Sequence, residues 1–132
     1  MALEETLRYS MQVHGIQGRF QVEGLEFELP VDVQHNVLRI CQEAIANAAR
    51  HGAPSRIDVT LGYEAGRLRA VVRDNGCGFA SGPAARPVAG HYGMAVMQER
   101  ARRHGGQIRI DSRPGEGTLV EATVPLHQEK RT

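Results

Sequence analysis

Four polar residues of one predicted helix have the types and spacing of a metal and phosphate site. Glu43, Asn47, Arg50 and His51 stand at positions i, i+4, i+7 and i+8. At about 100° per residue, they share an arc of roughly 80 to 100° at the edge of the apolar face. The helix therefore offers a carboxylate, an amide oxygen, a guanidinium and an imidazole to one adjoining space.

These groups suit a magnesium-bound triphosphate. Mg²⁺ takes hard oxygen ligands and keeps several of its waters, and a guanidinium pairs with phosphate oxygens. In this interpretation Asn47 is the metal ligand. The alternative is a solvated polar face that borders a core, which is common on amphipathic helices.

A second candidate segment, Asp74-Asn75-Gly76-Cys77-Gly78-Phe79, directly follows a predicted strand. Its glycines would let a flat ring approach the backbone closely. The carboxylate of Asp74 could then accept a hydrogen bond from the exocyclic amine of adenine. The alternative is a plain turn, because Asp, Asn and Gly are strong turn residues without any ligand.

Two further segments contain glycines at positions where a ligand could approach. Gly90-His91-Tyr92-Gly93-Met94 precedes a predicted helix, whose first N–H groups could bind phosphate oxygens. Gly115-Glu116-Gly117-Thr118 joins the last two predicted strands. Taken singly, the two segments are equally well explained as a loop-to-helix joint and a hairpin turn. Neither is a Walker-type phosphate loop, because the sequence has no GxxxxGK[ST].

Hydrophobic periodicity predicts the elements that position these groups. The second predicted helix has Asp32 available as its cap and Gly52 just past its end, and its apolar arc should pack on a sheet. Glycines and prolines without a period predict an irregular loop at 74–92. The predicted helices are 3–14, 33–51 and 93–104, and the predicted strands are 19–23, 57–63, 68–72, 108–110 and 120–124.

The order of these elements predicts an α+β fold. We expect a two-layer α/β sandwich in which a mixed, mostly antiparallel sheet has its helices on one face. The apolar arc of the second helix consists of Val37, Leu38, Cys41, Ala44, Ile45 and Ala48.

Composition limits the classes of function. The chain of 132 residues is 41% hydrophobic and 23% charged, which suits one globular domain. With 16 Lys and Arg against 15 Asp and Glu, it lacks the positive field of nonspecific nucleic-acid binding, so we expect no direct nucleic-acid contact. Cys41 and Cys77 have no CxxC spacing, which disfavours zinc and disulfides and indicates a cytoplasmic domain. The sequence has no run of about 18 apolar residues that could span a bilayer, so we expect no membrane contact by this domain.

Taken in order, the four motifs resemble the N, G1, G2 and final Gly-Thr boxes of one ATPase superfamily. That superfamily unites the ATP domains of gyrase, heat-shock chaperones, mismatch-repair proteins and histidine kinases, and has the Bergerat-type fold. Segments 42–52 and 90–101 are similar to the nitrate-sensor subfamily of bacterial sensor kinases. The resemblance covers residues 3–126, although family members often have Lys at Arg50 and Leu at Met94.

The resemblance implies a role for each motif residue. Glu43 and Asn47 would be catalytic: Asn47 would coordinate Mg²⁺, and Glu43 would orient a metal-bound water or assist proton removal. Asp74 would bind the adenine amine, supported by Thr118 directly or through water, and residues 79–92 would form an ATP lid. The implied ATP-binding set is Asn47, Arg50, His51, Asp74, Gly76, Gly78, Phe79, Gly90, His91, Tyr92, Gly93, Met94 and Thr118.

By the same resemblance, the domain would bind Mg-ATP and donate the γ-phosphate to a histidine on a separate dimerisation module. A response regulator, typically one that binds DNA, would then receive the phosphate. We expect residues 1–14 to be the trailing helix of that module, 15–126 the ATPase domain and 127–132 a disordered tail. The isolated domain would be monomeric, without autokinase activity, and part of a membrane-anchored sensor.

Two alternatives stay open on the sequence. One is an anti-sigma-type serine kinase that also binds its target as a regulator. The other is a degenerate domain that senses nucleotide without transferring phosphate, against which the presence of Glu43 and Asn47 argues.

Overall fold

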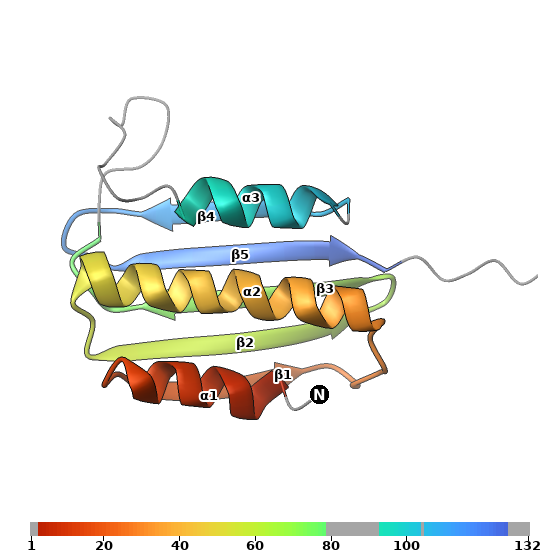
Figure 1. Ribbon diagram of the computed structural model, residues 1–132, viewed down its shortest axis with the longest axis horizontal. Coiled ribbons are helices and arrows are strands. Elements are labelled where there is room, and N and C mark those ends of the chain that lie inside the picture. Colours follow the sequence, from red (N-terminus) through yellow and green to blue (C-terminus); the bar gives the residue numbers. More distant parts are fainter. Residues whose placement is uncertain (1–2, 79–92, 104, 127–132) are drawn as a thin grey trace, which may run out of the picture.

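The computed structural model describes residues 3–78, 93–103 and 105–126. Its helices lie at one side of a single sheet (Figure 1). The helices are α1 (Leu3–Val13), α2 (Val31–Asn47), a π-helical continuation of α2, η1 (Ala48–Gly52), and α3 (Gly93–Arg103). The strands are β1 (Gln17–Glu23), β2 (Arg56–Glu64), β3 (Arg67–Asp74), β4 (Gln107–Ser112) and β5 (Thr118–Pro125).

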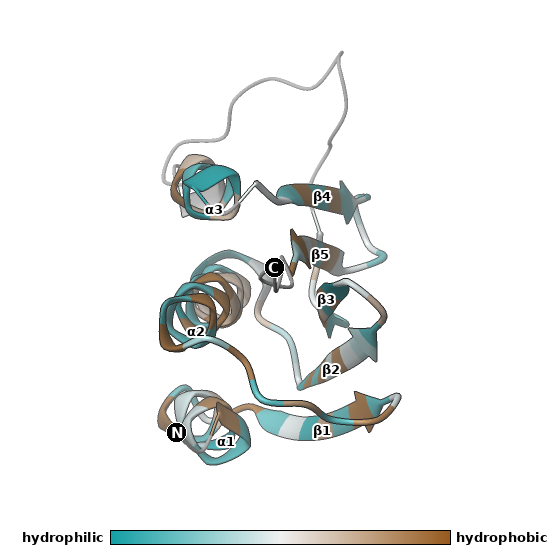
Figure 2. Ribbon diagram, turned by 90° about the vertical axis from the view of Figure 1, so that its right-hand side faces the viewer, coloured by the Kyte–Doolittle hydropathy of each residue, from teal (hydrophilic) through white to brown (hydrophobic). Residues whose placement is uncertain are grey.

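The sheet has the order β1-β2-β3-β5-β4. Strand β1 runs parallel to β2, and all other neighbouring strands are antiparallel. Figure 2 shows α1, α2 and α3 in one layer against one face of this sheet, with α2 in the middle. The predicted α+β two-layer sandwich is therefore confirmed.

The core forms where the apolar arc of α2 meets alternating residues of the strands. Val37, Cys41 and Ile45 of α2 are fully buried, and so is Ile40, which the predicted arc omitted. Burying one such aliphatic side chain stabilises the fold by about 1.5–3 kcal/mol. Leu3, Leu7 and Met11 of α1 belong to the same core cluster, together with the inward residues Ile57, Val59, Leu61, Leu68, Ala70, Val72, Val120, Ala122 and Val124 of the strands.

Both ends of the second helix differ from the prediction. The helix begins at Val31, so Asp32 lies in its first turn, where its carboxylate accepts from the N–H of Val33 at 3.0 Å, and the capping position belongs to Pro30. At the other end the helix widens into η1, and the left-handed residue is Ala53 (φ 45°) rather than Gly52. Short π-helical turns occur frequently at functional sites.

A buried amide joins the second and third helices. Asn36 is 5% exposed, and its Nδ2 donates to the backbone carbonyl of Arg100 at 2.7 Å. Met97 and Ala101 bury the inner face of α3 against the same core. Helix α3 is thus held at a fixed position beside α2. Within the described ranges, no helix has the length and apolar character needed to cross a membrane.

Candidate functional site

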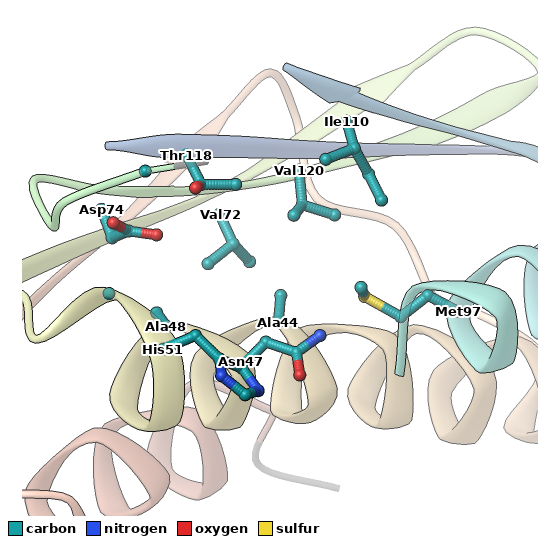
Figure 3. A pocket seen from close by; sticks show the side chains of 12 residues that line it. Ala44, Asn47, Ala48, His51, Val72, Asp74, Met97, Ile110, Thr118 and Val120 are labelled. Carbon is teal, nitrogen blue, oxygen red and sulfur yellow. The ribbon is translucent and has the colours of Figure 1, made fainter. Parts of the chain in front are cut away.

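A pocket lies between α2 with η1 and the sheet (Figure 3). Its cavity volume is about 30 Å³, so the pocket is narrow in this structure. Most of its wall is apolar, and its polar side chains come from both sides: Asn47 and His51 from the helix, and Asp74 and Thr118 from the strands. The lining residues are Ala44, Asn47, Ala48, His51, Gly52, Val72, Asp74, Gly78, Met97, Ile110, Thr118 and Val120.

Asp74 provides a buried carboxylate on the sheet side of this pocket. It is the last residue of β3 and pairs with Thr118, the first residue of β5. The N–H of Gly76 donates to its Oδ1 at 2.8 Å. Burial raises the pKa of Asp74, against the opposing effect of the Gly76 and Thr118 N–H groups. The carboxylate is therefore firmly oriented but poorly solvated, and a donor from a ligand would compensate its lost hydration.

Gly76 and Gly78 let three segments of backbone meet beside Asp74. A Cβ on Gly76 would collide with the carbonyl of Gly52, whose oxygen accepts from the N–H of Cys77 at 2.7 Å. Gly78 has φ +65°, and a Cβ there would collide with the carbonyls of Arg113 and Gly117. The two glycines therefore shape the pocket indirectly, since they bring the end of η1 and the β4–β5 turn close to the chain after β3.

The side chain of Asn75 joins the segment after β3 to the segment before β2, a role that the sequence did not predict. Its Oδ1 accepts from the N–H groups of Ser55 and Arg56, each at 3.0 Å, and its Nδ2 donates to Ser55 Oγ at 2.9 Å. The only signal in the sequence was an Asp-Asn-Gly turn, which gives no indication of a partner twenty positions away. Asn75 thereby fixes the chain between η1 and β2 against the segment that holds Asp74.

Thr118 reaches Asp74 through its backbone rather than through its hydroxyl. The Thr118 Oγ1 lies 2.7 Å from Ser112 Oγ, which also donates to the carbonyl of Gly117 at 3.1 Å. Ser112 is 2% exposed and was another residue missed by the sequence reasoning. These bonds hold the β4–β5 turn, so that the first N–H of β5 is aimed at the Asp74 carboxylate.

The helix side of the pocket brings three of the four predicted polar residues into direct contact. Arg50 Nη2 donates to Glu43 Oε2 at 3.1 Å and to Asn47 Oδ1 at 2.8 Å. Asn47 lines the pocket together with His51 (Figure 3), whereas Glu43 and Arg50 are not among its lining residues. The carbonyl of His51 accepts from Cys77 Sγ at 3.2 Å. The Nδ2 of Asn47 is buried and has no hydrogen-bond partner among the described residues.

The oxygens of this cluster fit a magnesium ion. Glu43 and Asn47 direct one hard oxygen each to the position of a single cationic nitrogen. In the described part of the chain, no group of three or more His, Cys, Asp and Glu residues could enclose a metal by itself. A metal here would take its remaining ligands from water or a bound anion, which is the habit of Mg²⁺.

Several predicted site residues lie outside the described residues: Phe79, Gly90, His91 and Tyr92. Gly93 is the first residue of α3 and Met94 is the second, although the Met94 side chain is not among those described.

The pocket, its buried carboxylate at a strand end and the polar cluster on the central helix are the features of an ATPase-type α+β domain. Residues 32–128 match the model of the histidine kinase-, DNA gyrase B- and HSP90-like ATPase family. The chain belongs to this family.

The relatives of this chain include a bacterial sensor histidine kinase and a bacterial sensor protein. The chain is 38% identical over 99 residues to sensor histidine kinase LiaS of Bacillus subtilis, covering 75% of this chain and 27% of LiaS. It is 34% identical over 107 residues to sensor protein VraS of Staphylococcus epidermidis, covering 81% of this chain and 30% of VraS. The chain thus spans less than a third of the length of these relatives.

Solved structures share the fold. The histidine kinase domain of the blue-light activated histidine kinase EL346 from Erythrobacter litoralis has a TM-score of 0.74 at 20% identity, covering 94% of this chain and 59% of that one. Histidine kinase AdeS of Acinetobacter baumannii has a TM-score of 0.74 at 13% identity, covering 96% and 64%. At these identities the likeness concerns the fold alone.

Proposed function

We propose that this domain binds Mg-ATP and donates its γ-phosphate to a histidine on a separate dimerisation module, within a two-component sensor kinase. The observation that carries the proposal is that a buried carboxylate, Asp74, lies across an apolar pocket from Asn47, which Arg50 joins to Glu43. A ligand with a flat amine-bearing base at one end and phosphates at the other matches this arrangement.

The base would lie on the sheet side. Asp74 accepts a hydrogen bond from the adenine amine, and the apolar side chains of Val72, Met97 and Val120 enclose the ring. Gly76 and Gly78 keep side chains away from the adjoining backbone. Because Asp74 is 8% exposed, a ligand that lacks the amine would leave its carboxylate poorly compensated.

The phosphates would lie at the end of α2. In this proposal Asn47 is a magnesium ligand, Glu43 orients a water or assists proton removal, and Arg50 and His51 face phosphate oxygens. Magnesium supplies charge neutralisation, and the remaining contribution of the protein is positioning. The backbone of residues 91–93, together with Phe79, Gly90 and Tyr92 of the lid segment and Met94 of α3, completes the proposed ATP site.

The names of the relatives, a sensor histidine kinase and a sensor protein, support the rest of the assignment. The partners are the dimerisation module of the full-length kinase and a response regulator, one that binds DNA. The domain itself is monomeric, contacts neither nucleic acid nor membrane, and forms the cytoplasmic part of a membrane-anchored sensor. Residues 1–14 trail from the dimerisation module, 15–126 form the ATPase domain, and 127–132 are the tail.

Calorimetric titration with a nonhydrolysable ATP analogue tests this proposal. Asp74→Asn should weaken binding about tenfold, because it replaces a charge-assisted hydrogen bond with a neutral one. Asn47→Asp should change the Mg²⁺ dependence of binding. Asp58→Asn is the matched control, since Asp58 lies on β2, away from the pocket, and pairs with Arg56 at 3.1 Å.

Three results would count against the proposal. A folded wild-type domain that does not bind the analogue would remove the ATP-site assignment. Equal losses in Asp74→Asn and Asp58→Asn would show a general effect of charge instead of a base contact. Binding without phosphate transfer in the full-length kinase would favour the nucleotide-sensing alternative.

A further inference from the structure

One guanidinium nitrogen lies at the point where the two proposed metal ligands converge. Arg50 Nη2 is 3.1 Å from Glu43 Oε2 and 2.8 Å from Asn47 Oδ1. Arg50 comes from η1, whereas Glu43 and Asn47 come from α2. The same nitrogen therefore joins the α-helical and π-helical parts of one continuous helix, and a positive charge stands between two hard oxygens.

This contact also decides which way the Asn47 amide points. With its oxygen toward Arg50, its nitrogen is buried and has no hydrogen-bond partner in the part of the chain that the structure describes. Turning the amide over would set an NH₂ group against the Arg50 donors, which is unfavourable because a guanidinium has no acceptor. Arg50 thus keeps the amide oxygen directed toward the converging point, although this leaves the amide nitrogen unsatisfied.

We infer that Arg50 holds together the two oxygens of the proposed metal position. It is a positioning residue that keeps Glu43 Oε2 and Asn47 Oδ1 converged, and it must release both oxygens when a divalent cation enters. Half of its side chain is exposed, so it can turn toward an incoming anion. This inference rests on the proposed function, because the anion that draws Arg50 away is the phosphate of the nucleotide.

The consequence is cooperative binding of metal and nucleotide. A cation that enters alone must displace a like charge, whereas a polyphosphate gives the guanidinium new acceptors and frees the two oxygens. Each ligand should therefore raise the affinity for the other by the same factor. A merely structural role for Arg50 predicts no such coupling.

The test compares wild type, Arg50→Gln and Arg50→Lys, with Arg39→Gln as control. Arg39 is an exposed arginine of the same helix that lies outside the pocket lining, so its substitution reports the effect of losing one charge. Mn²⁺ binding without nucleotide is measured by water-proton relaxation. Binding of a nonhydrolysable ATP analogue, with and without Mg²⁺, is measured by calorimetry, and circular dichroism verifies folding.

We expect opposite changes in the two affinities. Arg50→Gln should bind Mn²⁺ alone about fivefold more tightly or better, since a unit charge a few ångströms away no longer repels the ion. It should bind the ATP analogue more weakly, with less enhancement by Mg²⁺. Arg50→Lys should retain analogue binding, and Arg39→Gln should follow wild type in both assays.

The inference would be overturned if Arg50→Gln binds Mn²⁺ no more tightly than wild type, or if neither protein binds Mn²⁺ measurably. An equal gain in Mn²⁺ affinity in Arg39→Gln would also overturn it. The ATP assignment would survive each of these results if the wild-type domain binds the analogue. If wild type does not bind the analogue, the proposed function itself fails.

Discussion

At the scale of single residues, Asp74 is a proposed binding group whose charged form lowers the stability of the fold. Its folded-state pKa is raised by burial, more than its two N–H donors lower it. The ionised carboxylate is thus less favourable in the folded chain than in the unfolded chain. This arrangement is typical of a group that serves a ligand.

Asp74→Asn should therefore leave the stability at pH 7 unchanged or raise it, while it weakens nucleotide binding. For a carboxyl group whose pKa is raised on folding, the protonated form favours the fold, and this contribution is lost as the pH rises through the folded-state pKa. Urea unfolding at several pH values measures the effect. The difference between variant and wild type should shrink as the pH falls toward the unfolded value near 3.8, and a clear destabilisation at pH 7 would contradict this account.

At the scale of elements, the site depends on backbone segments that approach one another more closely than side chains allow. The chain after β3 meets both the end of η1 and the β4–β5 turn at glycines. The π-helical widening of α2 carries Arg50 and His51. Neither feature follows from the apolar periodicity, which predicted one regular helix up to position 51.

Gly78→Ala should destabilise the domain by several kcal/mol, whereas Gly66→Ala should cost about 1 kcal/mol. Both glycines have positive φ, +65° and +78°, so both substitutions strain the backbone. Only Gly78 has carbonyl groups in the way of a Cβ, while Gly66 has open space. Chemical denaturation of the two variants separates the cost of backbone strain from the cost of the collision between Cβ and the carbonyl groups. Equal losses of unfolding free energy would show that a small movement of the backbone relieves the collision.

At the scale of the whole molecule, a charge network spans the face of the sheet that the helices leave free. Arg69 of β3 contacts Glu23 of β1 at 3.2 Å, Glu64 of β2 at 3.2 Å and Glu121 of β5 at 3.3 Å. Glu121 also pairs with Arg109 of β4. The five strands are thus linked across the sheet, and the hydrogen bonds from Arg67 and Arg69 lower the pKa of Glu64.

Arg69→Met should lower the denaturation midpoint, and more strongly at low salt than at high salt. The substitution leaves three carboxylates without their shared partner, and screening reduces their mutual repulsion. Because the pKa of Glu64 is lowered on folding, its contribution is present above its unfolded value and is lost as the pH falls through the folded one. Arg19→Met, which removes an exposed arginine of β1, is the control; equal salt dependence in both variants would contradict the network.

Much of the fold could be predicted because its signals are local. The alternation of residues 57–63 and 68–72 and the helical period of 33–51 each record which side chains face the core, and the burial of Ile57, Leu68 and Ile45 confirms them. The contact of Asn47 with Arg50 also fits their i, i+3 spacing along one helix. The parallel pairing of β1 with β2 does not, since nothing in either strand specifies its neighbour.

The sequence by itself determined the elements, the class of fold and the set of polar residues on the central helix, because periodicity and i, i+4 spacing act within a few residues. Only the tertiary structure decided how these groups are held. Asn75 binds Ser55, Asn36 binds the carbonyl of Arg100, and Ser112 holds the turn before Thr118. Such bonds join residues from different elements, so they exist only once the chain has packed, and the same packing determines the raised pKa of Asp74.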